Sequence, residues 1–263
     1  MGLFKRSKRS GALVNWIIVS LGCLFLLNFA FSTISRASLA VAPVLLLMLG
    51  WRLAGWKGTA GACVVGAIVG SIYWVGSPSL RSRLEQSVAD ARSFQAADTI
   101  SPTSLHEVFL EESAAIISSA PIFGYGTGSI AKEFRLITAG QTGARGVATV
   151  NPHNQTFAVA IQIGLVGAGL LWAMWIAHLL LFRGGSVTAW IGAVVVVENV
   201  ISSAVHSHLF DFSNGWLYVF GVGVLGGTVK WRNQNCQLEK GTSQSSARVP
   251  GSGVTQRLAA GGR

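Results

Sequence analysis

Residues 155–182 read QTFAVAIQIGLVGAGLLWAMWIAHLLLF and contain no Asp, Glu, Lys or Arg. A helix needs about 20 mostly apolar residues to cross the hydrocarbon core of a bilayer. Five further runs have suitable length and few charges. They lie at 13–31, 37–56, 59–77, 187–205 and 212–229. Because the runs are too long and too uniformly apolar for the strands of a barrel, they predict six transmembrane helices.

The composition favours the same class of protein. Apolar residues make up 51% of the chain and charged residues only 11%, whereas about a quarter of the residues in an ordinary soluble domain are charged. Tryptophan prefers the membrane interface, and seven tryptophans fall near the ends of the runs. They are Trp16, Trp51, Trp56, Trp74, Trp190, Trp216 and Trp231. We therefore expect an all-α integral membrane protein.

The cationic residues predict the orientation, because Lys and Arg beside transmembrane helices are retained in the cytoplasm. The chain has 20 Lys and Arg residues. With the N-terminus in the cytoplasm, thirteen of them are cytoplasmic: Lys5, Arg6, Lys8, Arg9, Arg52, Lys57, Arg183, Lys230, Arg232, Lys240, Arg248, Arg257 and Arg263. Residues 1–12 then form a basic cytoplasmic N-terminus, 13–77 and 152–230 hold three helices each, 78–151 form a periplasmic loop, and 231–263 form a disordered cytoplasmic tail. The net charge of +10 is a topology signal, so we expect membrane lipids and no nucleic acid as partners.

The first run is better explained as a retained anchor than as a cleaved signal, because its apolar stretch is too long for one. Cys23 and Cys63 fall within predicted helices and Cys236 in the cytoplasmic tail, so no disulfide is expected. The chain has no Cys/His spacing typical of a metal site. We expect neither a metal nor another cofactor.

The loop at 78–151 is long enough to contain secondary structure of its own. Leu80, Leu84, Val88 and Ala91 recur at helical spacing and predict one amphipathic helix. Ser104 and Glu107 have the spacing of a capping box and predict the start of a second. Pro121 ends it, and the glycine-rich stretch PIFGYGTG follows at 121–128. Such a stretch can cradle a phosphate, but glycine turns without a ligand are commoner.

The segment NPHNQ at 151–155 lies where this loop returns to the membrane. Asn151 suits an N-cap and Pro152 the first helical position, which places His153 in the first turn of the next helix. The positive end of the helix dipole would bias His153 toward its neutral form, as a general base requires. The alternative is an interfacial histidine that only hydrogen-bonds the loop.

Arginines on the same side are candidates for binding a phosphate or diphosphate. Arg36 stands at the outer start of the second predicted helix, where a cation is disfavoured unless it has a use. A guanidinium can make two parallel hydrogen bonds to such a group. Arg81 and Arg83 lie on the first amphipathic helix. The alternatives are snorkelling to ordinary lipid phosphates for Arg36 and a solvated charged face for the loop arginines.

Further polar residues lie in or near the fifth predicted helix. Glu198 would be about 12 Å inside the membrane, where ionisable groups are costly and commonly functional. His206, His208 and Asp211 follow at its outer end and could orient His153 or bind substrate. An interfacial polar cluster is the alternative, and we assign His178, near the cytoplasmic end of the fourth helix, to structure.

Ser35-Arg36 at the start of a helix, PIFGYGTG at the end of the outer loop, and NPHN before Gly164-Leu-Val-Gly together resemble the O-antigen ligase and polymerase superfamily. The resemblance covers about residues 33–227. It implies a partial fold of the GT-C type in the bacterial inner membrane. Members transfer a glycan from an undecaprenyl diphosphate carrier to lipid A core or a polysaccharide on the periplasmic face, without a metal.

By this resemblance His153 matches the catalytic histidine and Arg36 a diphosphate-binding arginine, to which Arg81 or Arg83 could add. Asn154, Glu198, His206, His208 and Asp211 are candidates for supporting roles. His106 stands where many relatives have an arginine. Relatives usually have ten to twelve membrane helices, so a second chain could supply the missing ones. The alternatives are an inactive truncated homologue and a non-catalytic assembly or transport protein with a polar route through its helices.

Overall fold

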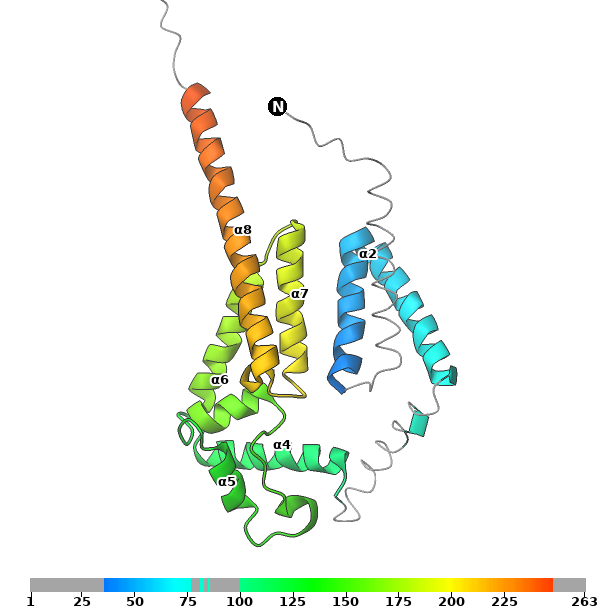
Figure 1. Cartoon of the computed structure of the whole chain (residues 1–263), viewed down its shortest axis with the longest axis vertical. Helices are drawn as coiled ribbons and strands as arrows, with labels where there is room; N and C mark the ends of the chain where they lie inside the picture. The colour runs from blue at the N-terminus through cyan, green and yellow to red at the C-terminus, as the bar shows by residue number, and fades with distance from the viewer. Residues whose placement is uncertain (1–35, 77–80, 83–84, 86–99, 248–263) are drawn as a thin grey trace, which may run out of the picture.

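The computed structural model of the chain describes residues 36–76, 81–82, 85 and 100–247 (Figure 1). Within these residues all regular secondary structure is helical, which confirms the all-α class. The elements are α2 (Arg36–Gly76), α4 (Pro102–Ser119), α5 (Ile130–Ile137), η1 (Gly143–Gly146), α6 (Gln155–Leu181), α7 (Val187–Ser202), η2 (His208–Phe210) and α8 (Phe212–Ala247).

Helix α2 consists of two legs joined by a sharp bend. Ala54 and Gly55 leave helical geometry there, and Gly55 has a φ of 58°, a conformation that glycine adopts without a steric penalty. The legs approach closely beyond the bend, where a Cβ on Gly50 would lie 2.5 Å from the carbonyl oxygen of Gly58. The predicted helices at 37–56 and 59–77 are therefore present as two legs, with the bend slightly earlier than expected.

Two described segments are long and apolar enough to cross a membrane: Gln155–Leu181, and Ala40–Gly76, which contains the bend between the two legs of α2. Val187–Ser202 is apolar but shorter. The predicted helix at 13–31 lies outside the described residues. Membrane-spanning helices are thus supported, while the number of six stays a prediction.

Helices α6, α7 and α8 pack around one apolar core. Trp175, Val196, Tyr218 and Val222 are among its buried members. Polar side chains inside this bundle pair with one another: Trp175 Nε1 donates to Asn199 Oδ1 at 3.2 Å, and His178 Nδ1 lies 2.7 Å from the Tyr218 hydroxyl. The pairing of His178 with Tyr218 is consistent with the structural role expected for it.

The two ends of the bundle carry different segments. Figure 1 shows the bend of α2 and the α6–α7 connection at one end, whereas α4 crosses the opposite end with α5 beyond it. At the first end Arg52 Nη2 donates to the Gly185 carbonyl at 2.9 Å. The segments predicted to be cytoplasmic and those predicted to be periplasmic therefore lie at opposite ends of the bundle.

Helix α4 begins earlier than the sequence suggested. Its N-cap is Ser101, whose hydroxyl accepts from the Ser104 amide, while the Ser104 hydroxyl accepts from the Ser101 amide. The expected capping box of Ser104 with Glu107 is wrong because Pro102 suits the first helical position and moves the start forward. Of the amphipathic helix expected before α4, only residues 81–82 and 85 are described.

The segment after Val229 also differs from the expectation. Helix α8 continues to Ala247 and projects beyond the other helices (Figure 1), so the expected disordered tail at 231–263 is wrong up to that residue. Residues 231–247 include three Gln together with Leu, Glu and Lys, all good helix formers, and this segment contains no proline. They extend a helix that is already nucleated by its apolar part. Residues 248–263 lie outside the described residues.

Candidate functional site

Helix α6 is interrupted at Gly164, which has a φ of 71° and a ψ of −167°. The glycine-rich stretch 121–128 docks against this break. Its backbone bonds there are Tyr125 N to Ile161 O (2.9 Å), Gly126 N to Gln162 O (2.9 Å) and Leu165 N to Pro121 O (2.7 Å). The loop thus satisfies backbone groups of α6 that the break leaves without intrahelical partners.

The glycines of the motif are needed for this close approach. A Cβ on Gly124 would lie 2.6 Å from the Ile161 carbonyl oxygen, and one on Gly164 would collide with the Ile122 carbonyl. The Gly128 amide donates to Gln162 Oε1 at 2.7 Å. The motif therefore serves to dock the loop on α6.

His153 does not lie in the first turn of α6, as the sequence suggested. The N-cap is Asn154, whose side chain accepts from the Phe157 amide at 3.0 Å, and the helix begins at Gln155. Asn151 instead accepts from the His153 amide at 2.9 Å, which closes a local turn. Asn154 also donates to the Ala204 carbonyl at 3.1 Å. This bond joins the start of α6 to the α7–α8 connection.

His153 has a φ of 54° and is the only non-glycine residue with a positive φ among the described residues. This conformation costs about 1–2 kcal/mol for an ordinary residue. The turn made by Asn151 and the burial of Pro152 hold it in place. Strain of this kind is common at functional sites, and here it places the imidazole between α4 and the α7–α8 connection.

Four imidazoles gather around this position. The His153 ring is nearly parallel to that of Phe109 at 6.1 Å between centroids, meets His206 edge-on at 5.0 Å and lies 6.3 Å from His106. His206 is in turn 5.1 Å from His208. The structure therefore brings together three predicted residues, His153, His206 and His208, and adds His106 from α4. We call these four the histidine cluster.

The environment lowers the pKa of His153. Half-burial disfavours the imidazolium, and the neighbouring His206 and His106 disfavour it further. His153 is therefore neutral at pH 7. Neutrality was expected from the helix dipole, but the causes are burial and the adjacent imidazoles. The pKa of His208 is also lowered by burial and His206, which outweigh the nearby Asp211.

Two residues that sequence reasoning did not single out hold the α7–α8 connection. Gln155 is fully buried, its backbone N–H donates to the Ser203 carbonyl, and its side-chain Oε1 accepts from the Leu209 backbone N–H, both at 2.9 Å. Asn214 Nδ2 bonds Asp211 Oδ2 at 2.7 Å and His208 Nδ1 at 2.9 Å. Asp211 thus reaches His208 through Asn214. A polar residue at the start of an apolar run was the available signal for Gln155.

A buried carboxyl on α4 was also missed. Glu112 is 3% exposed, and neither carboxyl oxygen has a hydrogen-bond partner. Burial raises its pKa to about 7, with Glu111 adding to the effect and Arg145 opposing it. The Arg145 guanidinium pairs with Glu111 instead, at 2.7 Å. Glu112 therefore keeps its proton to a higher pH than an ordinary carboxyl does.

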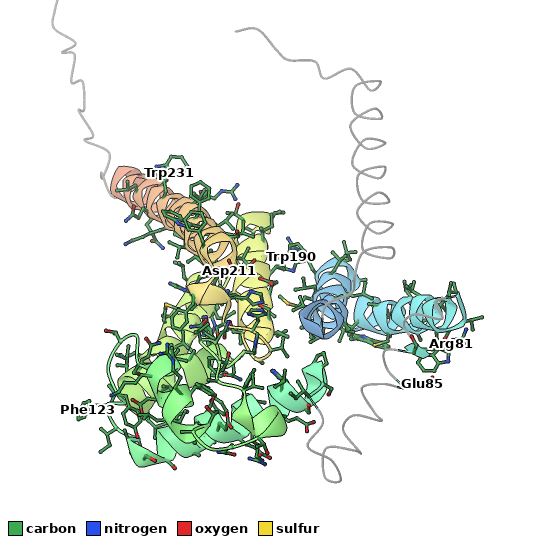
Figure 2. The ribbon with its side chains drawn as sticks, turned by 60° about the horizontal axis from the view of Figure 1, so that its bottom comes forward. Arg81, Glu85, Phe123, Trp190, Asp211 and Trp231 are labelled. Carbon is green, nitrogen blue, oxygen red and sulfur yellow. The ribbon has the colours of Figure 1, made fainter. Side chains whose placement is uncertain are left out.

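The remaining predicted residues lie apart from the histidine cluster or have no described side chain. Arg36 is the first residue of α2, but its side chain is not described. Figure 1 shows the start of α2 at the end of the bundle that α4 crosses. Arg81 donates to the Val75 carbonyl at 3.1 Å. Figure 2 shows Arg81 beside the second leg of α2 and well away from Asp211. Arg83 lies outside the described residues, and Glu198 lies within α7.

No group of three or more His, Cys, Asp or Glu side chains within the described part of the chain is arranged to hold a metal ion. The imidazoles of the histidine cluster contact one another through their rings. What the cluster offers chemically is a neutral, half-buried imidazole with further N–H donors beside it.

The part of the chain that contains His153 matches a known protein family. The O-antigen ligase family matches residues 21–172, more than half of the chain. No curated protein sequence matches the chain. The matched segment includes α2, α4, the glycine-rich loop with the break of α6, and His153. The chain belongs to the O-antigen ligase family, whose bacterial membrane enzymes act in polysaccharide and lipopolysaccharide assembly.

Proposed function

We propose that the chain is an inner-membrane glycosyltransferase that moves a glycan from an undecaprenyl diphosphate carrier to a lipid A core or polysaccharide acceptor on the periplasmic face. The observation that carries this proposal is the position of His153, which is half-buried with the rings of His106 and His206 beside it. These surroundings lower the pKa of His153, which favours the neutral imidazole that can accept the proton of a sugar hydroxyl.

In the proposed reaction His153 takes the proton of the acceptor hydroxyl while the hydroxyl oxygen attacks the anomeric carbon of the donor sugar. The bond between that carbon and the diphosphate oxygen breaks, and undecaprenyl diphosphate leaves with the electron pair. The lowered pKa of His153 keeps it unprotonated before the step. The charge that develops on the leaving diphosphate requires hydrogen-bond donors or cations nearby.

Arg36 is the first candidate for binding that diphosphate. It begins α2 at the end of the bundle where α4 lies, and its fork of N–H donors suits a diphosphate. His106 stands where many relatives have an arginine and lies beside His153, so we propose that its ring donates to a phosphate oxygen of the donor. Arg81 and Arg83 stay predictions as further contacts.

The test is glycan transfer from a lipid-linked donor by the purified chain in nanodiscs. His153→Gln should lower transfer by about 10²–10⁴-fold, the usual contribution of a general base. His178→Gln is the matched control, because His178 bonds Tyr218 in the bundle core and should retain transfer when the folded protein is assayed. Wild-type transfer by His153→Gln would refute the proposal.

Arg36→Lys tests the binding of the diphosphate. A lysine keeps the charge but loses the two-pronged geometry, so the variant should bind the donor more weakly. Unchanged donor affinity would instead indicate an arginine that only reaches lipid phosphates. A substrate flux across proteoliposomes that needs Glu198 and tolerates loss of His153 would favour the non-catalytic alternative.

A further inference from the structure

Two apolar side chains at the start of the glycine-rich loop are left uncovered. Ile122 is 59% exposed and Phe123 is 74% exposed. Figure 2 shows Phe123 pointing outward from the edge of the molecule. We call this pair the apolar tip. The surrounding stretch 121–128 contains no charged residue, and Tyr125 next to the tip is also exposed.

Backbone hydrogen bonds fix the position of the apolar tip along α6. Leu165 donates to the Pro121 carbonyl at 2.7 Å, and Val166 donates to the Ile122 carbonyl at 3.4 Å. Leu165 is itself 59% exposed. The tip therefore lies beside the exposed apolar side chains of a helix that is long and apolar enough to cross a membrane.

The break of α6 at Gly164 indicates how deep in the membrane the apolar tip lies. From Gly164 to Leu181 the helix has about 18 residues, or about 27 Å at 1.5 Å per residue, close to the hydrocarbon thickness of about 30 Å. If Leu181 lies at one boundary of the hydrocarbon core, Gly164 lies near the other. The side chains docked at Gly164 are then level with the outer acyl chains and head groups.

We propose that the apolar tip inserts into the outer leaflet and binds the acyl chains of its phospholipids. Burying Ile and Phe side chains in hydrocarbon stabilises the inserted position, and a tyrosine beside them suits the interface. The loop that follows leads into α5, which packs with α4 around Phe109, Ile130 and Phe134. Insertion of the tip thus holds α4 and its His106 at a fixed height above the bilayer. This inference does not depend on the proposed glycosyl transfer.

The test is the depth of a nitroxide spin label in the full-length chain in phospholipid nanodiscs. The three native cysteines, Cys23, Cys63 and Cys236, are first replaced by serine. Single cysteines are then introduced as Phe123→Cys and Ile122→Cys for the tip. The comparisons are Leu165→Cys on α6 and Leu136→Cys, an exposed apolar residue on α5, which lies beyond α4 (Figure 1).

Collisions with oxygen, which concentrates in lipid, and with a water-soluble nickel chelate report the environment of each label. We expect labels at 122 and 123 to match the label at 165, with high oxygen and low nickel accessibility, and the label at 136 to show several-fold higher nickel accessibility. Nickel accessibility at 123 equal to that at 136 would overturn the proposal. Low accessibility to both reagents at 123 would also overturn it, because a second polypeptide or second copy would then cover the tip.

Discussion

Gly124 and Gly164 are in direct backbone contact, and a Cβ on Gly124 would lie 2.7 Å from the amide nitrogen of Gly164. Both residues have left-handed φ values, 66° and 71°. One belongs to the outer loop and the other to the break of α6. The contact joins the part of the chain that contains α4 and α5 to a membrane-length helix.

Gly164→Ala should destabilise the fold. The left-handed conformation costs about 1–2 kcal/mol for alanine, and the clash with the Ile122 carbonyl adds to it, so we expect a loss of at least about 2 kcal/mol. Thermal unfolding in detergent measures this. Gly169→Ala is the control, since nothing lies within 4 Å of its Cβ position. Equal midpoints for the two variants would contradict the role of the contact.

The rate of transfer should fall as the pH drops below neutrality. Protonation of His153 removes the base, and because its pKa is lowered, the acid limb should lie below pH 6.5. His206→Gln removes a neighbour that disfavours the imidazolium, so the pKa of His153 should rise and the acid limb should move to higher pH. His208→Gln is the comparison, because His208 is not among the groups that shift His153. A larger shift with His208→Gln would contradict the assignment.

Glu112→Gln should raise the stability at alkaline pH. The pKa of Glu112 is raised from 4.5 to about 7 in the folded chain. Between these two pH values the folded state keeps the Glu112 proton, whereas the unfolded state has lost it. The contribution of Glu112 to stability is therefore most favourable below pH 4.5 and is lost as the pH rises through 7.

The resulting gain for Glu112→Gln is up to about 3 kcal/mol at pH 8 and close to zero at pH 4. Thermal unfolding at the two pH values measures it. Glu111→Gln, which breaks an exposed ion pair with Arg145, should change the stability by about 1 kcal/mol or less at pH 8. A gain for Glu112→Gln that is the same at both pH values would show that its ionisation is not the cause.

Trp175→Phe should destabilise the bundle by about 1–3 kcal/mol, because it leaves the buried Asn199 Oδ1 without its donor. Asn199→Leu combined with Trp175→Phe removes both polar groups and should recover part of the loss. The four proteins of the double-mutant cycle are compared by unfolding in detergent. Strictly additive losses would show that the hydrogen bond contributes nothing.

The apolar helices could be predicted closely because the length of an apolar run is a local property of the sequence. The run 155–182 corresponds to α6 (Gln155–Leu181), and the run 187–205 contains α7 (Val187–Ser202). Helix ends were less predictable. Asn151 and Asn154 are both suitable N-caps, and the local sequence does not distinguish them. Asn154 is the N-cap in the structure, where its side chain also donates to the carbonyl of Ala204, far along the chain.

Part of the histidine cluster could also be predicted from the apolar runs. His153 precedes one run, and His206 and His208 follow another. These ends of the two runs lie on the same side of the predicted topology, so the proximity of the three histidines could be anticipated. His106 and Gln155 could not be placed there, because their contacts depend on how α4 and the α7–α8 connection fold back over the start of α6. Loop geometry of this kind arises from tertiary packing, which a periodic pattern does not encode.

The most direct test of the central claim is chemical rescue of His153→Ala with added imidazole. If a neutral His153 is the base, the variant should lose about 10²–10⁴-fold in transfer rate, and imidazole should restore part of it. The restored rate should grow with the unprotonated fraction of imidazole as the pH rises. Transfer by His153→Ala at the wild-type rate without imidazole would contradict the account.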